Sequence, residues 1–185
     1  MSRGRWVSGV LVVGVLAGSM FLFRTRSWGA GHAQVEDLQT RIAKGFAIAP
    51  VPLDLRGKDR DLVGLGSYIV NAQTACNDCH TDPSYEAGHD PFRGEEERIN
   101  AAGYLKGGKK AGEGIVSPDL TPDAQGRPGG LTLEQFAHAV GTGEDPGHPG
   151  RRLQMMPWPV YRLMTLDDQR AVYEYLKAIP SSHAH

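Results

Sequence analysis

Two cysteines and a histidine form the most distinctive cluster in this sequence. Residues 75–80 read ACNDCH, and Cys76 and Cys79 are the only cysteines among the 185 residues. The spacing C-x-x-C-H serves three chemistries: covalent attachment of a c-type haem, a redox-active dithiol, and one half of a zinc site. Because both cysteines belong to one cluster, none is left for a structural disulfide elsewhere.

The haem interpretation explains all three residue types at their positions. Two thiols three residues apart can reach the two vinyl groups of one porphyrin, and His80 is then placed to ligate the iron from the proximal side. A dithiol motif is expected beside a βαβ pattern, and none surrounds this cluster. A structural zinc ion needs four nitrogen or sulfur ligands, and no other histidine stands at a suitable spacing, neither His89 nor His138 nor His148. The sequence therefore favours a covalently attached haem.

A second axial ligand is expected downstream of the histidine. A haem iron held by histidine on one side takes methionine, histidine or an open position on the other. Met155 and Met156 lie in the stretch RRLQMMPWPVY, which is too rich in proline for a helix and can present a thioether from a loop. Met164 is expected in the core, while His138 and His148 are the alternatives for a bis-histidine iron. One of the two adjacent methionines is therefore the expected ligand.

The first 23 residues predict export. Residues 6–23 contain no charged residue and follow a basic start with Arg3 and Arg5. This apolar run is at the lower limit for a membrane-spanning helix and is longer than the apolar core of an average signal peptide. We therefore expect residues 1–23 to be an uncleaved membrane anchor. A cleaved signal peptide and a buried helix of the folded domain are the alternatives.

Composition divides the remaining chain into three parts. Residues 24–56 are expected to be a tether with a short amphipathic helix, residues 57–180 the folded domain, and residues 181–185 a disordered tail. The 24 glycines and 12 prolines predict extensive loops. No strand-like alternation is convincing in the sequence. We therefore expect a mainly α fold, with three to four helices and long loops in the domain.

Three helices of the domain follow from apolar spacing and capping signals. Gly64 and Gly66 weaken the first half of the helix that leads into the cysteines. Thr132 opens the next helix with a capping box, and Gly141 is its expected stop. Acidic residues in the first turn mark the start of the last helix. The expected ranges are 61–72, 132–140 and 165–179.

A long loop separates the cysteine motif from the second of these helices. Residues 81–130 have weak periodicity, with a short hairpin or turn expected around GYLKGGKKAGEG. A loop of this length is unusual in a compact domain unless it wraps something. A haem would fill that role, and Trp158, Tyr161, Tyr173 and Tyr175 are expected to pack around it.

Four stretches, which together cover most of residues 60–180, share their motifs and their order with a known family. They are GLGSYIVNAQTACNDCHT (64–81), SPDLTPD (117–123), LTLEQFAHAVGTG (131–143) and MPWPVYRLMTLDDQRAVYEYLKAIP (156–180). These stretches resemble the class I monohaem cytochromes c found beside periplasmic bacterial dehydrogenases. The larger dehydrogenase cytochromes have three C-x-x-C-H motifs, whereas this sequence has one, so the resemblance implies a single-haem module.

The resemblance also implies a set of site residues. One haem c would be bound through Cys76 and Cys79, with His80 as the proximal ligand. The methionine directly before Pro-Trp-Pro would be the distal ligand, which selects Met156 over its neighbour. The stretch from Thr121 to Asp123 would lie near the haem propionates.

Electron transfer is the function that this resemblance implies. An iron with two filled axial positions has no open site for a substrate, so we expect an electron carrier that is not itself an enzyme. Its partners would be a dehydrogenase donor and a cytochrome or oxidase acceptor on the periplasmic side of the bacterial inner membrane, or in the soluble periplasm if residues 1–23 are cleaved. The alternative is a haem enzyme or gas-binding haem protein with a labile distal ligand. The formal net charge of −1 gives no indication of nucleic-acid binding.

Overall fold

The computed structural model describes residues 37–112 and 114–183, and this part of the chain is mainly helical. A π-helical turn, η1 (Ile69–Gln73), and two 3₁₀ turns, η2 (Pro91–Arg93) and η3 (Ala101–Gly103), accompany six α-helices. The six are α1 (Leu38–Ile48), α2 (Arg60–Tyr68), α3 (Cys76–His80), α4 (Leu133–Thr142), α5 (Trp158–Tyr161) and α6 (Leu166–Ala178). Within the described ranges there is no strand, only isolated bridges between loop residues. The expected mainly α class is confirmed.

The apolar segment at the start of the sequence lies outside the described residues. The expected anchor or signal peptide over residues 1–23 therefore stays a prediction. No helix of the described part is long and apolar enough to cross a membrane.

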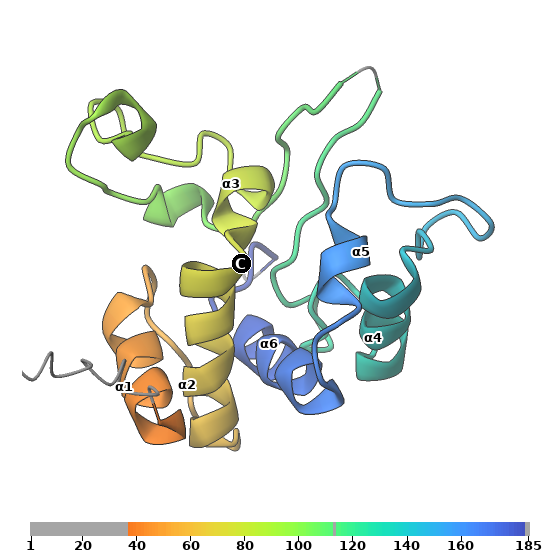
Figure 1. Cartoon of the computed structure of the whole chain (residues 1–185), viewed down its shortest axis with the longest axis horizontal. Helices are drawn as coiled ribbons and strands as arrows, with labels where there is room; N and C mark the ends of the chain where they lie inside the picture. Colours follow the sequence, from red (N-terminus) through yellow and green to blue (C-terminus); the bar gives the residue numbers. More distant parts are fainter. Residues whose placement is uncertain (1–36, 113, 184–185) are drawn as a thin grey trace, which may run out of the picture. The chain divides into compact units, whose positions relative to one another are not determined.

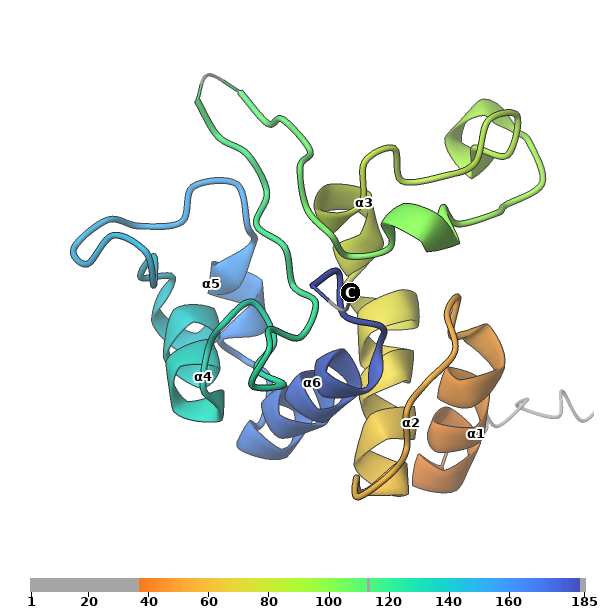
Figure 2. The same ribbon diagram turned by 180° about the vertical axis from the view of Figure 1, so that it is seen from behind.

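All three helices expected in the domain are present, as α2 continued by η1, as α4 and as α6 (Figures 1 and 2). The expected capping box at Thr132 opens α4. A second capping box, between Thr165 and Asp168, opens α6. The end of α4 differs from the prediction: the helix stops at Gly143, with φ of 70°, rather than at Gly141. Glycine readily takes this left-handed conformation, which terminates a helix.

Glycines let α2 pack closely against both α1 and α6, which flank it in Figures 1 and 2. A Cβ on Gly66 would overlap the carbonyl oxygen of Ala171 in α6, and a Cβ on Gly64 would lie 2.7 Å from Cγ2 of Ile42 in α1. Glycine weakens a helix interior by about 1 kcal/mol relative to alanine. Here the missing side chains allow the helix backbones to approach. The two glycines that weakened the helix prediction therefore serve the packing of that helix.

The apolar faces of these helices meet in one core. Val172, Tyr175 and Leu176 of α6 are all buried. They form the face that the apolar spacing of the last helix indicated. Leu105, from the long loop, is fully buried with them. The phenol oxygens of Tyr104 and Tyr175 lie 2.9 Å apart inside this core, so the long loop contributes Tyr104 and Leu105 to a mainly helical centre.

The compact unit starts earlier than the expected domain boundary at residue 57. Ile42 of α1 is buried, and the unit that contains α2 and α6 also takes in α1. The backbone N–H of Asp54 donates to the carbonyl of Ala178 at 2.8 Å, which joins the connecting segment to the end of α6. Residues 38–56, expected as a tether with a short helix, are thus packed as part of the fold.

The C-terminal end is also held against a loop. The Ser181 hydroxyl donates to the carbonyl of Pro122 at 2.6 Å, and the Ser182 hydroxyl donates to Asp119 at 2.5 Å. Thr121, which the resemblance placed near the haem propionates, is buried beside these serines. Residues 181–183, expected to be disordered, therefore make specific contacts.

The expected hairpin is present within the long loop. Lys110 and Val116 form an antiparallel bridge, and the backbone N–H of Ser117 donates to the carbonyl of Lys109 at 2.9 Å. We call residues 108–117 the 108–117 hairpin. It matters for the site because its ends contact α3.

Candidate functional site

The cysteine motif occupies α3, a five-residue helix preceded by irregular backbone. The π turn η1 ends where the N–H of Thr74 donates to the carbonyl of Ile69 at 3.0 Å. Ala75 then adopts the left-handed conformation, with φ of 51°. This conformation costs a residue with a side chain about 1–2 kcal/mol. Such strain and π turns concentrate at functional sites, so the backbone independently marks the position that the cysteines mark in the sequence.

Both cysteines of α3 are free thiols. Cys76 is half-buried with its sulfur 3.2 Å from the Thr74 hydroxyl, while Cys79 is exposed. Burial raises the pKa of the Cys76 thiol, which favours the protonated form. Redox-active cysteines have lowered pKa values because the thiolate is the nucleophile. The surroundings of Cys76 therefore do not favour this residue as the attacking thiolate of a redox dithiol.

One ring nitrogen of His80 is engaged by the backbone. Nδ1 lies 2.9 Å from the carbonyl oxygen of Pro118, which can only accept a hydrogen bond, so Nδ1 carries the proton. In the neutral ring this tautomer leaves the lone pair on Nε2, the arrangement found in metal-binding histidines. Burial lowers the pKa of His80, against a smaller opposite effect of the bond to Pro118, and so favours the neutral ring. The neutral ring of His80 therefore carries its lone pair on Nε2, as an imidazole that binds a metal through that nitrogen would.

The residues that flank the 108–117 hairpin hold α3 from one side. The N–H of Gly107 donates to the carbonyl of His80 at 2.7 Å. Gly107 has φ of 71°, and a Cβ there would lie 2.5 Å from the carbonyl carbon of Pro118. The two segments that flank the hairpin therefore cross at a distance that only glycine permits. This crossing places the Pro118 carbonyl against the imidazole.

The methionine pair lies directly before α5. Met155 is 56% exposed, and Met156 is half-buried in the bend that leads into the helix. The stretch was expected to be non-helical, and α5 corrects this prediction for four residues. Pro159 is tolerated because it stands in the first turn of α5, where a backbone N–H would have no partner within the helix. The two methionines themselves stay outside the helix.

Tyr161 joins α5 to the segment before the cysteines. Its hydroxyl donates to the carbonyl of Thr74 at 2.8 Å. Burial raises the pKa of Tyr161 to about 12, and Cys76 and Cys79 are close enough to add to this effect. The short helix that begins two residues after Met156 is therefore adjacent to the cysteine motif. Tyr161 is one of the aromatic residues expected to pack around a haem, but no local sequence pattern indicates Thr74 as its partner.

The other candidate ligands have different contacts. Nε2 of His138 is 3.0 Å from the Glu144 carboxylate, and Nδ1 of His148 is 3.4 Å from the Asp145 carboxylate. Both histidines are exposed. Met164 packs against the hydrophobic core, as expected. Over the described ranges, no group of three or more histidine, cysteine, aspartate or glutamate side chains is arranged to hold a metal ion.

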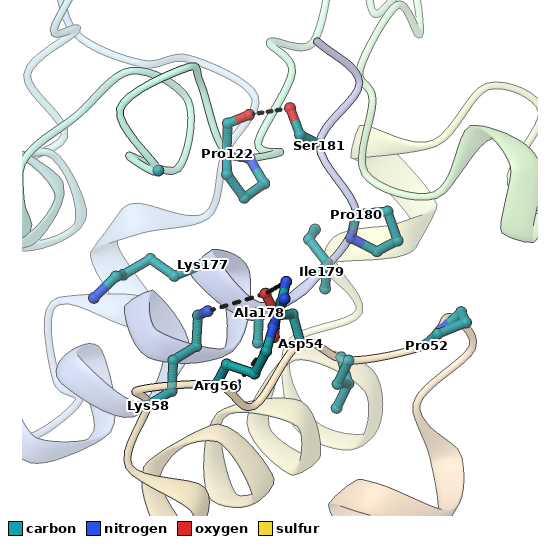
Figure 3. Close-up of a pocket in the computed structure, with 12 residues that line it drawn as sticks. Pro52, Asp54, Arg56, Lys58, Pro122, Lys177, Ala178, Ile179, Pro180 and Ser181 are labelled. Carbon is teal, nitrogen blue, oxygen red and sulfur yellow. Dashed lines mark hydrogen bonds and ion pairs between the residues drawn. The ribbon is translucent and has the colours of Figure 1, made fainter. Parts of the chain in front are cut away.

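A pocket of about 550 Å³ lies where the segment before α2 meets the end of α6 (Figure 3). None of its lining residues belongs to α3 or to the methionine pair. Its cationic side chains have acidic partners. Asp54 lies 2.9 Å from Arg56 and 3.9 Å from Lys58, and Lys177 pairs with Glu174 at 3.0 Å. Because Asp54 is shared by two cations, these side chains together keep a net positive charge.

Comparisons with protein-family models, with curated proteins and with solved structures found no match to this chain. The functional proposal therefore depends on the residues of the site. These are the two thiols and the oriented imidazole of α3, the 108–117 hairpin with its flanking residues, and the methionine-containing segment. Tyr161 joins that segment to the residues before the cysteines by a hydrogen bond.

Proposed function

We propose that this chain is a class I-type monohaem cytochrome c that transfers electrons. The observation that carries the proposal is the C-x-x-C-H motif on one helical turn, with Nδ1 of His80 held 2.9 Å from the Pro118 carbonyl. Cys76 and Cys79 would bind one haem c through two thioether bonds, His80 would ligate the iron through Nε2, and Met156 would be the distal ligand.

The residues around the motif fit this group. Both sulfurs are free, and the raised pKa of Cys76 is no obstacle to a thioether, which does not ionise. When bound, the haem supplies a one-electron iron couple. The chain supplies the two sulfurs for attachment, the orientation of His80, and the helical core that supports the motif.

An electron carrier is favoured over an enzyme because of the expected donor set. A histidine and a methionine together would fill both axial positions, which leaves no open position for a substrate. Methionine ligation also raises the reduction potential of a haem iron relative to other ligand sets. The corresponding partners are a dehydrogenase donor and a cytochrome or oxidase acceptor. We place the protein on the periplasmic side of the bacterial inner membrane, anchored through residues 1–23, or in the soluble periplasm if that segment is cleaved.

Covalent haem content tests this proposal. The full chain is produced in cells that have a c-type haem maturation system, and denatured samples are analysed by haem staining and intact mass. One haem that survives denaturation is expected in the wild type, and none in the Cys76→Ala/Cys79→Ala double variant. A wild-type chain that carries zinc, or that cycles between dithiol and disulfide without haem, would overturn the proposal.

A further inference from the structure

A lysine side chain is hydrogen-bonded to the backbone of the cysteine motif. Nζ of Lys109 donates to the carbonyl oxygen of Asp78 at 2.6 Å and to the hydroxyl of Ser84 at 2.7 Å. Asp78 stands between the two cysteines, whereas Lys109 belongs to the 108–117 hairpin, 31 positions further along the chain. The lysine is half-buried, so its contact with the motif is partly shielded from solvent.

The contact gives the short helix α3 a cationic partner near its end. The last carbonyls of a helix have no partner within the helix, and a cation near them is favourable because the helix dipole is negative there. The Ser84 hydroxyl also donates to the Asp78 carbonyl, at 3.2 Å. Lys109 therefore connects α3, the residues that follow it, and the hairpin through one ammonium group.

The charge of Lys109 is not neutralised by an ion pair within residues 37–112 and 114–183. The carboxylate of Asp78, which belongs to the same short helix, accepts a hydrogen bond from the Tyr85 hydroxyl at 2.8 Å. The adjacent Lys110 is exposed. A half-buried charge is screened less by water and salt than an exposed one. Lys109 thus differs from Lys110 in the strength of the field it exerts on α3.

We propose that Lys109 positions the C-x-x-C-H helix and raises the reduction potential of the haem attached to it. This inference rests on the function proposed above. Reduction of the iron adds one electron at α3, and a nearby positive charge stabilises the added negative charge. The same ammonium group holds the backbone between the two cysteines, so it acts on both the geometry and the potential of the site.

Variants of Lys109 separate charge from packing. Lys109→Met removes the charge and the hydrogen bonds but keeps an apolar stem, and Lys109→Arg keeps the charge. Lys110→Met is the matched control, because it makes the same charge change one residue away in an exposed position. The midpoint potential of the haem-loaded protein is measured by spectroelectrochemical titration. The denaturant midpoint of the haem-free chain is measured in parallel.

The expected result is a lower midpoint potential for Lys109→Met than for the wild type, with Lys109→Arg and Lys110→Met close to the wild type. The haem-free Lys109→Met chain should also unfold at a lower denaturant concentration than Lys110→Met. Equal potentials for the two methionine variants would overturn the inference while covalent haem in the wild type still supports the proposed function. Absence of covalent haem from the wild type would instead defeat the proposed function. If Lys109→Met does not fold, Lys109→Gln is compared with Lys110→Gln. A lower potential for Lys109→Gln would then support the inference, and equal potentials would overturn it.

Discussion

Single atoms determine what His80 can do. The carbonyl of Pro118 accepts a hydrogen bond from Nδ1–H, so the lone pair of the neutral ring is on Nε2, and the positive φ of Gly107 allows that carbonyl to approach. Neither residue is part of the C-x-x-C-H motif. The motif therefore supplies the imidazole, while two loop residues orient it.

The distal ligand is tested by one substitution with a neighbouring control. Met156→Ala should lower the midpoint potential and convert the reduced haem from low-spin to high-spin, because a thioether ligand is lost. Met155→Ala, at the exposed neighbour, should leave both properties unchanged. Absorption spectroscopy and redox titration measure the two effects. A normal spectrum and potential in Met156→Ala would show that another residue ligates the iron.

Carbon monoxide distinguishes the electron carrier from the gas-binding alternative. A stable Met156 ligand should make binding of carbon monoxide to the reduced wild type slow and incomplete. Met156→Ala should bind it rapidly, because the distal position is then open. Stopped-flow absorption measures both rates. Rapid binding to the wild type would favour a haem protein with a labile distal ligand.

Among the secondary-structure elements, the crossing of α2 and α6 depends on the smallness of Gly66. Gly66→Ala should destabilise the protein by about 3 kcal/mol, since the added methyl group would overlap the Ala171 backbone in a well-packed core. Gly141→Ala, inside α4 with open space around the new Cβ, should instead stabilise it by about 0.5–1 kcal/mol. Equilibrium denaturation measures both changes. Equal effects of the two substitutions would contradict the close approach of α2 and α6.

The contact between α5 and the segment before the cysteines should depend on pH. The pKa of Tyr161 is raised to about 12, chiefly by burial, whereas a tyrosine in the unfolded chain ionises near 10. Its contribution to stability is therefore present below about pH 10 and is lost as the pH rises towards 12. Tyr161→Phe should remove this contribution, so its free energy of unfolding should fall less steeply than that of the wild type over this range. Parallel slopes would show that the phenol is not held in this environment.

Across the whole molecule, the helical core and the methionine-containing segment differ in burial. Residues of α2 and α6 are largely buried, whereas residues 144–165 are half-buried or exposed. In the haem-free Cys76→Ala/Cys79→Ala chain, amide hydrogens of 144–165 should therefore exchange faster than those of α2 and α6. Covalent haem should slow this exchange in the wild type, because the proposed distal ligand, Met156, would tie the segment to the haem. Hydrogen-exchange mass spectrometry measures the difference, and equal protection with and without haem would argue against a haem ligand in this segment.

Local patterns were sufficient for the regular part of the fold. Apolar spacing, the capping box of α4 and the acidic first turn of α6 located α2, α4 and α6 because these signals act within a few residues of the chain. The same patterns gave no indication of α3 and α5, which are too short to show periodicity. Gly64 and Gly66 counted against the helix prediction for α2. The value of those glycines depends on Ala171 and Ile42, whose proximity is a property of the packed chain.

The sequence by itself determined the chemistry that is available: two thiols and an imidazole at fixed spacing, and a methionine pair in a proline-rich stretch. Only the tertiary structure decided how these groups are held. The partners of His80, Lys109 and Tyr161 lie 38, 31 and 87 positions away in the chain, so no local pattern indicates them. Their contacts follow from the path of the loops around the helical core. The six residues ACNDCH therefore specify a reactive motif, and the 108–117 hairpin with its flanking residues and α5 give it its orientation and surroundings.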